Sequence, residues 1–215
     1  MAEQQKTKRA SKLGPLVVEA LKARHFDAWY FDETADALDK LWSLIPKTDV
    51  VSWGGSLTFD DVGGLTGMAK ERGYAVIDRD SAPNAEERAR LQREALSCGT
   101  FLTGTNAISE DGQLVNVDGI GNRVAAMIYG PRQVIVIAGM NKVVKTLDDA
   151  VVRARKVAAP LNAMRFDVLK TPCAKNGTCA DCKSPESICT YIVTTRLSRP
   201  AGRIKVLLIG KDLGL

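Results

Sequence analysis

The sequence predicts a three-layer α/β fold, in which helices cover both faces of a central sheet. Two patterns support this prediction. Short apolar runs alternate along the chain with longer segments of helical periodicity, and such alternation is typical of a sheet whose strands are joined by helices. In addition, several apolar runs end in glycine and small polar residues, as strands do where they run into ligand-binding loops.

The first half of the chain alternates between helix and strand patterns. Apolar residues at helical spacing predict the helices, and Pro46 and Gly73 supply two of the stop signals. Asn84 supplies a start, with Glu87 as its partner in a capping box. In chain order, the expected elements are a helix at 13–24, a strand at 26–31, a helix at 34–44, a strand at 49–53, a helix at 57–72, a strand at 74–77 and a helix from Asn84.

The second half adds a β-hairpin and a cysteine-rich loop to this alternation. Asp111 and Gly112 lie between two short apolar runs, which is a typical hairpin turn signal. Pro160 follows the last predicted helix. In chain order, the expected elements are a strand ending at Leu102, a hairpin of 107–108 with 114–117, a helix at 122–129, a strand at 133–138, a helix at 146–157, a loop at 173–189, and closing strands at 191–195 and 204–209.

One domain is expected at residues 13–215, because neither an internal repeat nor a low-complexity linker interrupts the pattern. The composition, 45% hydrophobic and 26% charged, suits a substantial core. Residues 1–12 are polar and basic with no apolar run after them, so we expect a disordered tail and no secretory signal. No apolar stretch approaches the ~20 residues of a membrane span, and a cytoplasmic protein is expected.

The net charge of +5 comes largely from residues 1–12 and from residue 196 onward. No long basic helix and no aromatic-interleaved basic stripe accompanies this charge. Nucleic acid is therefore not an expected partner. Solvated chain ends account better for the excess.

Four strand ends supply the candidate ligand-binding residues. In an open α/β sheet, ligands bind in the crevice beyond the carboxyl ends of the strands. At any single position, the turn itself is the better explanation of glycine and asparagine, but repetition at several strand ends favours a shared pocket. The candidates are Gly54, Gly55 and Ser56 after the first strand end, Gly104, Thr105 and Asn106 after the second, Asp118, Gly121, Asn122 and Arg123 after the third, and Asn141 and Lys142 after the fourth.

These candidates favour an anionic ligand. Glycines let backbone N–H groups approach an anion at the start of a helix, and Lys142 is able to pair with a carboxylate or a phosphate, although capping an adjacent element is the alternative. Asp118 is the candidate general base, and an ordinary turn role has equal weight. His25 is the only histidine and lies far from these strand ends in sequence, so no Ser-His-Asp arrangement is expected.

Four of the five cysteines lie close together, in the pattern C-x5-C-x2-C-x6-C formed by Cys173, Cys179, Cys182 and Cys189. Four thiolates in a polar loop suit zinc or an iron–sulfur cluster. The spacing leans toward iron and sulfur, because it is one residue off a plant-type ferredoxin run, whereas zinc ribbons usually show two C-x2-C pairs. Two disulfides are the remaining interpretation, and a reducing cytosol disfavours them.

Three tracts of the sequence together resemble one known protein family. They are TGTNAISEDGQLVNVDGIGNRVAAMIYGPRQVIVIAGMNK, the cysteine segment TPCAKNGTCADCKSPESIC and the ending GRIKVLLIGKDLGL. Together with the VVSWGGS turn, they resemble the LUD family of lactate-utilisation proteins over residues 13–215. The resemblance implies a Rossmann-like fold similar to that of glucosamine-6-phosphate isomerase, ribose-5-phosphate isomerase and the CoA transferases. It also implies a role beside iron–sulfur subunits that oxidise lactate to pyruvate.

The expected function is that of an accessory or electron-transfer subunit in the oxidation of lactate or a related hydroxy acid. Such a subunit binds a small anionic metabolite and carries an iron–sulfur cluster at the four cysteines. One alternative is an isomerase-like or sugar-phosphate-binding protein with a structural zinc, and another is an interaction module that docks iron–sulfur partner subunits. The sequence leaves open whether the chain is itself an oxidoreductase, which substrate it takes and which oligomeric state it adopts.

Overall fold

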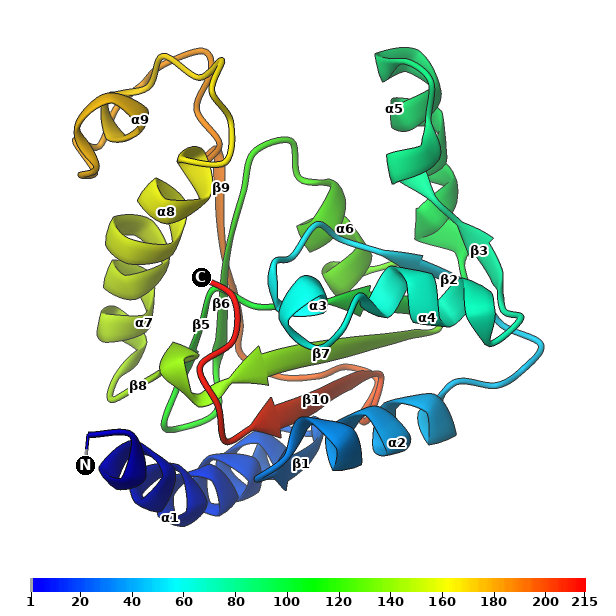
Figure 1. The fold of residues 1–215 in the computed structure, drawn as a ribbon, viewed down its shortest axis with the longest axis vertical. Coiled ribbons are helices and arrows are strands. Elements are labelled where there is room, and N and C mark those ends of the chain that lie inside the picture. Colours follow the sequence, from blue (N-terminus) through cyan, green and yellow to red (C-terminus); the bar gives the residue numbers. More distant parts are fainter. Residues whose placement is uncertain (1) are drawn as a thin grey trace.

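A computed structural model of the chain describes residues 2–215. Its centre is a six-stranded sheet in which every neighbouring pair of strands is parallel (Figure 1). The all-parallel arrangement is what the alternating sequence predicts. In spatial order, the strands are β1 (Asp27–Phe31), β10 (Ile204–Ile209), β7 (Gln133–Gly139), β4 (Thr100–Thr103), β2 (Val50–Trp53) and β3 (Ala75–Ile77).

Helices pack on both faces of this sheet, which confirms the predicted three-layer α/β fold. Along β7, Val134 and Val136 belong to the apolar cluster on one face, and Ile135 and Ile137 to the cluster on the other. Burial on both faces explains why this strand is continuously apolar. The helices are α1 (Ala2–Ala23), α2 (Thr34–Leu44), α3 (Thr58–Asp61), α4 (Leu65–Glu71), α5 (Ala85–Glu94), α6 (Asn122–Ile128), α7 (Leu147–Arg153), α8 (Ala159–Ala163) and α9 (Pro172–Asn176).

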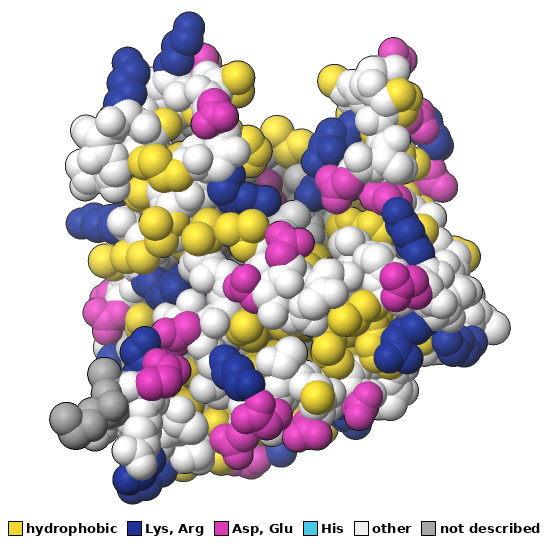
Figure 2. Space-filling view, viewed as in Figure 1, with side chains coloured by type: hydrophobic (Ala, Val, Ile, Leu, Met, Phe, Trp, Pro, Cys, Tyr) yellow, Lys and Arg dark blue, Asp and Glu magenta, His cyan; other side chains and the backbone are white. Residues whose placement is uncertain are grey.

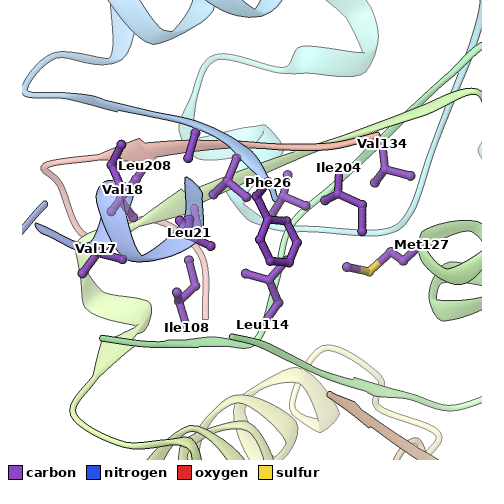
Figure 3. Packing of buried hydrophobic residues seen from close by; sticks show 14 of the residues in the cluster. Val17, Val18, Leu21, Phe26, Ile108, Leu114, Met127, Val134, Ile204 and Leu208 are labelled. Atoms are coloured by element: carbon purple, nitrogen blue, oxygen red, sulfur yellow. The ribbon is translucent and has the colours of Figure 1, made fainter. Parts of the chain in front are cut away.

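Helix α1 covers one face of the sheet through a row of aliphatic side chains. Val17, Val18 and Leu21 point into the same cluster as Phe26 and Leu208 (Figure 3). Burying a leucine such as Leu21, which has no exposed surface, contributes roughly 1.5–3 kcal/mol. On the opposite face, α2, α3 and α4 contribute the buried side chains Leu41, Phe59 and Leu65.

A second, four-stranded sheet stands beside the central one. The predicted hairpin is confirmed within it, because β5 and β6 pair antiparallel with Ala107 opposite Val115. The two predicted closing strands separate, since β9 pairs with β6 while β10 inserts between β1 and β7. In spatial order, the strands are β8 (Val143–Val144), β5 (Ala107–Ser109), β6 (Leu114–Asp118) and β9 (Tyr191–Thr195).

The expectation of a disordered basic tail at residues 1–12 is wrong for residues 2–12, and Met1 lies outside the described residues. Residues 2–12 are the first turns of α1. Ala10 is buried in the core, and the Lys6 Nζ lies 2.7 Å from Asp212 Oδ2. A buried contact and a link to the far end of the chain give this polar segment partners that its composition alone does not reveal.

Two predicted helices are divided by local backbone chemistry. The helix expected at 57–72 breaks between α3 and α4, because Gly63 and Gly64 have φ values of +99° and +83°, a region that glycine enters without strain. The helix expected at 146–157 runs beyond its predicted end, through the π-helical turn Ala154–Ala158 into α8. Pro160 does not stop it, because proline in the first turn of a helix loses no hydrogen bond there.

The start of α5 forms half of the predicted capping box. Asn84 Oδ1 accepts a hydrogen bond of 2.9 Å from the backbone N–H of Glu87, as expected for an N-cap. The Glu87 carboxylate instead pairs with Arg90. Among residues 2–215, no helix combines the length and the apolar character that crossing a bilayer requires.

Candidate functional site

A cavity of about 510 Å³ opens at the carboxyl ends of β2, β3, β4 and β6. Figure 2 shows the face hollowed between two projecting arms, which are formed by α8 with α9 and by α5. Ten of the residues proposed from the strand ends line it. They are Gly54, Gly55, Ser56, Gly104, Thr105, Asn106, Asp118, Asn122, Arg123 and Lys142.

The strand ends meet as the sequence predicts, although they come from two sheets. The loop after β6 reaches the cavity from the second sheet, and the other ends reach it from the central sheet. Gly121 and Asn141 lie outside the lining. Asn141 instead fixes the segment after β10, because its Oδ1 accepts a 3.1 Å hydrogen bond from the N–H of Leu213.

Three glycines of the lining let side chains lie directly against the backbone. A Cβ at Gly54 would stand 2.8 Å from Cδ of Arg123, and a Cβ at Gly55 would stand 2.7 Å from Nη2 of Arg79. At Gly104, a Cβ would stand 2.7 Å from Oγ of Ser56. The glycines therefore make room for the polar groups of the cavity, which is a steric need beyond the turn itself.

Arg123 is a buried crosslink in the floor of the cavity. Its Nη1 donates to Oδ1 of Asn116 at 2.6 Å, and its Nη2 donates to Oδ1 of Asn106 at 3.0 Å and to the carbonyl of Val117 at 2.7 Å. Burial lowers the pKa of Arg123, and the nearby Asp118 opposes this shift. Both Nη atoms already have protein acceptors, so Arg123 shapes the site and offers few free N–H groups to a ligand.

Asp118 caps helix α6 from inside the cavity. Its Oδ1 accepts a 2.8 Å hydrogen bond from the N–H of Gly121, and its Oδ2 accepts a 3.3 Å bond from the N–H of Val124. The side chain is only 7% exposed, and Nε of Arg123 lies 3.8 Å from Oδ2. This geometry favours the turn-and-cap interpretation of Asp118 over the general-base interpretation. It also means that the start of α6 already holds a negative charge.

Lys142 is a buried amine at the end of β7. The residue is 3% exposed, yet it lines the cavity, and its Nζ donates a 2.9 Å hydrogen bond to Oγ1 of Thr58. Burial is the largest influence on its pKa, and the positive charges of Arg153 and Arg123 act in the same direction. Together they lower the pKa to about 7, against the opposing effect of Asp61.

Three arginines of the cavity were not predicted from the sequence. Arg79 follows β3, Arg88 lies on α5 and Arg165 follows α8. Nε of Arg79 is buried without a hydrogen-bond partner among residues 2–215, and Oδ1 of Asp80 lies 3.6 Å from it. Arg79 was detectable, because the Asp-Arg-Asp run after the predicted strand at 74–77 is a fifth polar strand end. Arg88 and Arg165 carry no comparable signal.

The resulting cavity has more positive than negative side chains. Five basic side chains line it, namely Arg79, Arg88, Arg123, Lys142 and Arg165, against three acidic ones, Asp60, Asp80 and Asp118. Because two of the acidic groups already accept hydrogen bonds from the protein, the cavity offers a net attraction to anions.

The four clustered cysteines line a second, smaller cavity of about 50 Å³ between α8, α9 and the loop that follows. All four are free thiols in the structure. Burial, and then the neighbouring Cys173, Cys179 and Cys182, raise the pKa of Cys189 to about 11. Within residues 2–215, no three potential ligands are close enough together to hold a metal ion. The four predicted ligands therefore line one small cavity without standing at metal-binding distance from one another, and their binding of a metal stays a prediction.

The sequence and the fold place the chain among known proteins. A family model described as the LUD domain matches residues 15–209. The chain belongs to the LUD domain family. A DUF162 family protein from Deinococcus radiodurans has a similar structure, with a TM-score of 0.53 and 12% identity over 93% of this LUD domain protein and 98% of that chain. A ribose 5-phosphate isomerase A from Neisseria gonorrhoeae overlaps 53% of this chain and 54% of its own, with a TM-score of 0.34 and 16% identity. The comparison of this chain with curated proteins found no match.

In this LUD domain protein, the two cavities share a wall. Ile188, which precedes the last cysteine of the loop, lines both of them. A Cβ at Gly119 would stand 3.3 Å from Cα of Ile188, so the cysteine loop rests directly on the turn after β6. Helix α8 also faces both, through Asn162 on one side and Pro160 on the other. The cysteine loop therefore forms part of the wall of the larger cavity.

Proposed function

We propose that this LUD domain protein binds a small organic anion, lactate or a related hydroxy acid, in the larger cavity, and acts as an accessory or electron-transfer subunit of lactate utilisation. The excess of basic side chains at the carboxyl edge of the sheet is the observation that supports the anion. Family membership supports the hydroxy acid. A substrate of this size carries one carboxylate, which a cluster of cationic side chains recognises well.

Arg79 and Lys142 are the side chains that we assign to the ligand. Among residues 2–215, Nε of Arg79 is buried without a hydrogen-bond partner, and a buried N–H that lacks an acceptor costs about 1–3 kcal/mol. A ligand carboxylate would satisfy it. Arg123, by contrast, is held by protein acceptors and keeps Asn106 in place beside the ligand.

Calorimetric titration with lactate tests this proposal through Arg79. We expect Arg79→Gln to weaken binding about tenfold or more, because a charged hydrogen bond contributes roughly 1.5–3 kcal/mol. Arg93→Gln is the matched control, since Arg93 is an exposed arginine on α5 that does not line the cavity. Equal loss of affinity in both variants would show that general charge, and not the cavity, attracts the anion.

We propose in addition that Cys173, Cys179, Cys182 and Cys189 hold one metal centre, with an iron–sulfur cluster favoured and zinc as the alternative. Two observations support this: the four thiols face one small cavity, and the loop that carries them has little apolar core of its own. Such a loop gains order from a metal. A cluster would supply one-electron transfer, whereas zinc would supply a structural crosslink.

Metal analysis of anaerobically purified protein tests the second proposal. We expect iron with inorganic sulfide in the wild type and loss of the metal in Cys182→Ser. Cys98→Ala is the control, because Cys98 is buried in the main core and lies outside the cysteine cavity. A colourless protein with one zinc would favour the isomerase-like alternative, and unchanged metal in Cys182→Ser would refute the site. Iron–sulfur subunits are the partners that we propose for the iron-containing form.

A further inference from the structure

Lys142 is a buried lysine without an acidic partner. It projects from the short 3-10 turn Met140–Lys142, just after β7. Its Nζ donates a hydrogen bond to Oγ1 of Thr58, and no carboxylate oxygen lies within 4 Å of its Nζ among residues 2–215. An unpaired ammonium is expensive to bury. Packing alone therefore does not account for a lysine at this position.

The charges that face Lys142 are fixed in place by the protein. Arg153 of α7 donates from Nε to the carbonyl of Asn141 at 3.0 Å, and from Nη1 to the carbonyl of Asn106. Arg123 of α6 is held in the cavity floor. Within residues 2–215, Asp61 of α3 is the one acid that acts on the amine, and its Oδ2 accepts a 2.6 Å hydrogen bond from the N–H of Gly214.

This environment favours the uncharged amine. Two fixed cations and burial both oppose protonation of Lys142, and they lower its pKa to about 7. Desolvation beside cationic groups is a known way to convert a lysine into a nucleophile. The backbone of Gly214 closes one side of the amine, since a Cβ there would stand 3.2 Å from Nζ. Lys142 also belongs to the lining of the larger cavity.

We propose that Lys142 forms an imine with the carbonyl carbon of a 2-oxo acid bound in the larger cavity. The inference rests on the proposed anion site, because the basic side chains around the cavity are required to hold the carboxylate of that acid. A 2-oxo acid is also the product of oxidising a 2-hydroxy acid, so one cavity accommodates both members of such a pair.

The proposed step balances in atoms and charge. The lone pair of the neutral Nζ attacks the carbonyl carbon, and one of the two amine protons passes to the carbonyl oxygen to give a neutral carbinolamine. The second amine proton then passes to the hydroxyl group, which leaves as water while the nitrogen lone pair forms the C=N bond. One amine and one ketone yield one imine and one water, with no oxidant or reductant. The hydroxyl of Thr58, which accepts a hydrogen bond from Nζ, positions the amine for attack.

Borohydride trapping with pyruvate tests the inference, because borohydride reduces an imine to a stable secondary amine. We expect one covalent adduct per chain in the wild type, and peptide mapping should place it on Lys142. Lactate has no carbonyl group to attack and should give no adduct. Lys142→Arg should lose the adduct while keeping the positive charge, and Lys142→Met serves as a second variant if the arginine does not fit the site.

Lys145→Met is the matched control and should keep the adduct, since Lys145 is exposed and pairs with Glu110 at 2.6 Å. Trapping in the wild type should become faster as the pH rises through about 7, the pKa of Lys142. Calorimetry with pyruvate distinguishes a failure of the imine proposal from a failure of the anion site on which it rests. Binding without an adduct, or an adduct that survives in both Lys142 variants, would overturn the imine. Absence of binding would overturn the anion site as well.

Discussion

Basic side chains of the same cavity differ in role because their hydrogen-bond partners differ. Among the described residues 2–215, Arg123 is held by several oxygen acceptors, Arg79 has a buried Nε without a hydrogen-bond acceptor, and Lys142 has a single hydroxyl partner. The sequence identified Arg123 and Lys142 as site residues, because both follow strand ends. It did not separate a structural arginine from a ligand-binding one, since that difference depends on Asn106 and Asn116 meeting Arg123 across the hairpin.

Replacing Arg123 should destabilise the fold more than it changes the charge of the cavity. Arg123→Ala leaves Oδ1 of Asn116 and the carbonyl of Val117 without their donor, and each unsatisfied buried group costs about 1–3 kcal/mol. We expect a loss of roughly 3 kcal/mol or more in the free energy of unfolding, measured in urea. Arg93→Ala, an exposed control, should change it by less than about 0.5 kcal/mol. Similar changes in the free energy of unfolding for the two variants would show that Arg123 does not stabilise the fold.

Lys142 should also impose a pH dependence on stability. Its pKa is lowered from 10.5 to about 7 in the folded protein, so the unfolded chain binds the proton more tightly between these values. Stability therefore rises with pH across this window, and the full cost of burying the ammonium is present below it. Lys142→Met should be most stabilised relative to the wild type below pH 7 and lose that advantage toward pH 10.5. Urea unfolding at several pH values measures this. If the pKa of Lys142 is not lowered, the difference in the free energy of unfolding between the variant and the wild type will not change with pH.

At the scale of elements, the sequence predicts strands and their ends better than helix limits. A strand that is buried on both faces of the sheet, such as β7, is a short continuous run of apolar residues, and such a run is recognisable in the sequence. Helices depend more on the backbone and on distant partners. The break at Gly63 and Gly64 follows from left-handed φ values, and the ordering of residues 2–12 follows from contacts such as Lys6 with Asp212, at the far end of the chain.

Two glycines with opposite steric surroundings test the packing of these elements. Gly139 ends β7, and a Cβ there would stand 2.4 Å from the carbonyl oxygen of Lys211. Gly139→Ala should therefore destabilise the protein by about 1–3 kcal/mol. Gly67 lies inside α4 with nothing within 4 Å of a Cβ, so Gly67→Ala should stabilise it by about 0.5–1 kcal/mol. Thermal unfolding of the two variants should shift in opposite directions, and a shared direction would contradict the packing.

At the scale of the whole molecule, the larger cavity and the cysteine cavity share a wall. The sequence predicts a shared pocket and a cysteine cluster as separate features, because residues 105–123 and 173–189 lie far apart in the sequence and the contact of Gly119 with Ile188 arises in the folded chain. Ile188 carries no chemical signal in the sequence. Its place in the walls of both cavities makes it the residue that joins them.

Loss of the metal from the cysteine loop should therefore weaken anion binding in the larger cavity. We expect the dissociation constant for lactate to rise about fivefold or more in metal-free protein, the lower end of usual coupling energies between sites. In Ile188→Ala, this dependence on the metal should shrink. Calorimetry on the same preparation before and after chelation measures it, and identical affinities in the two states would show that the sites are independent.

We propose that the larger cavity binds a small carboxylate through Arg79 and Lys142, and a crystal structure grown with saturating lactate would decide this. We predict the carboxylate in the cavity, with one oxygen about 3 Å from the guanidinium of Arg79 and the 2-hydroxyl group facing Nζ of Lys142. Lactate bound only on the outer surface, with no acid between the arms formed by α8 with α9 and by α5, would contradict it.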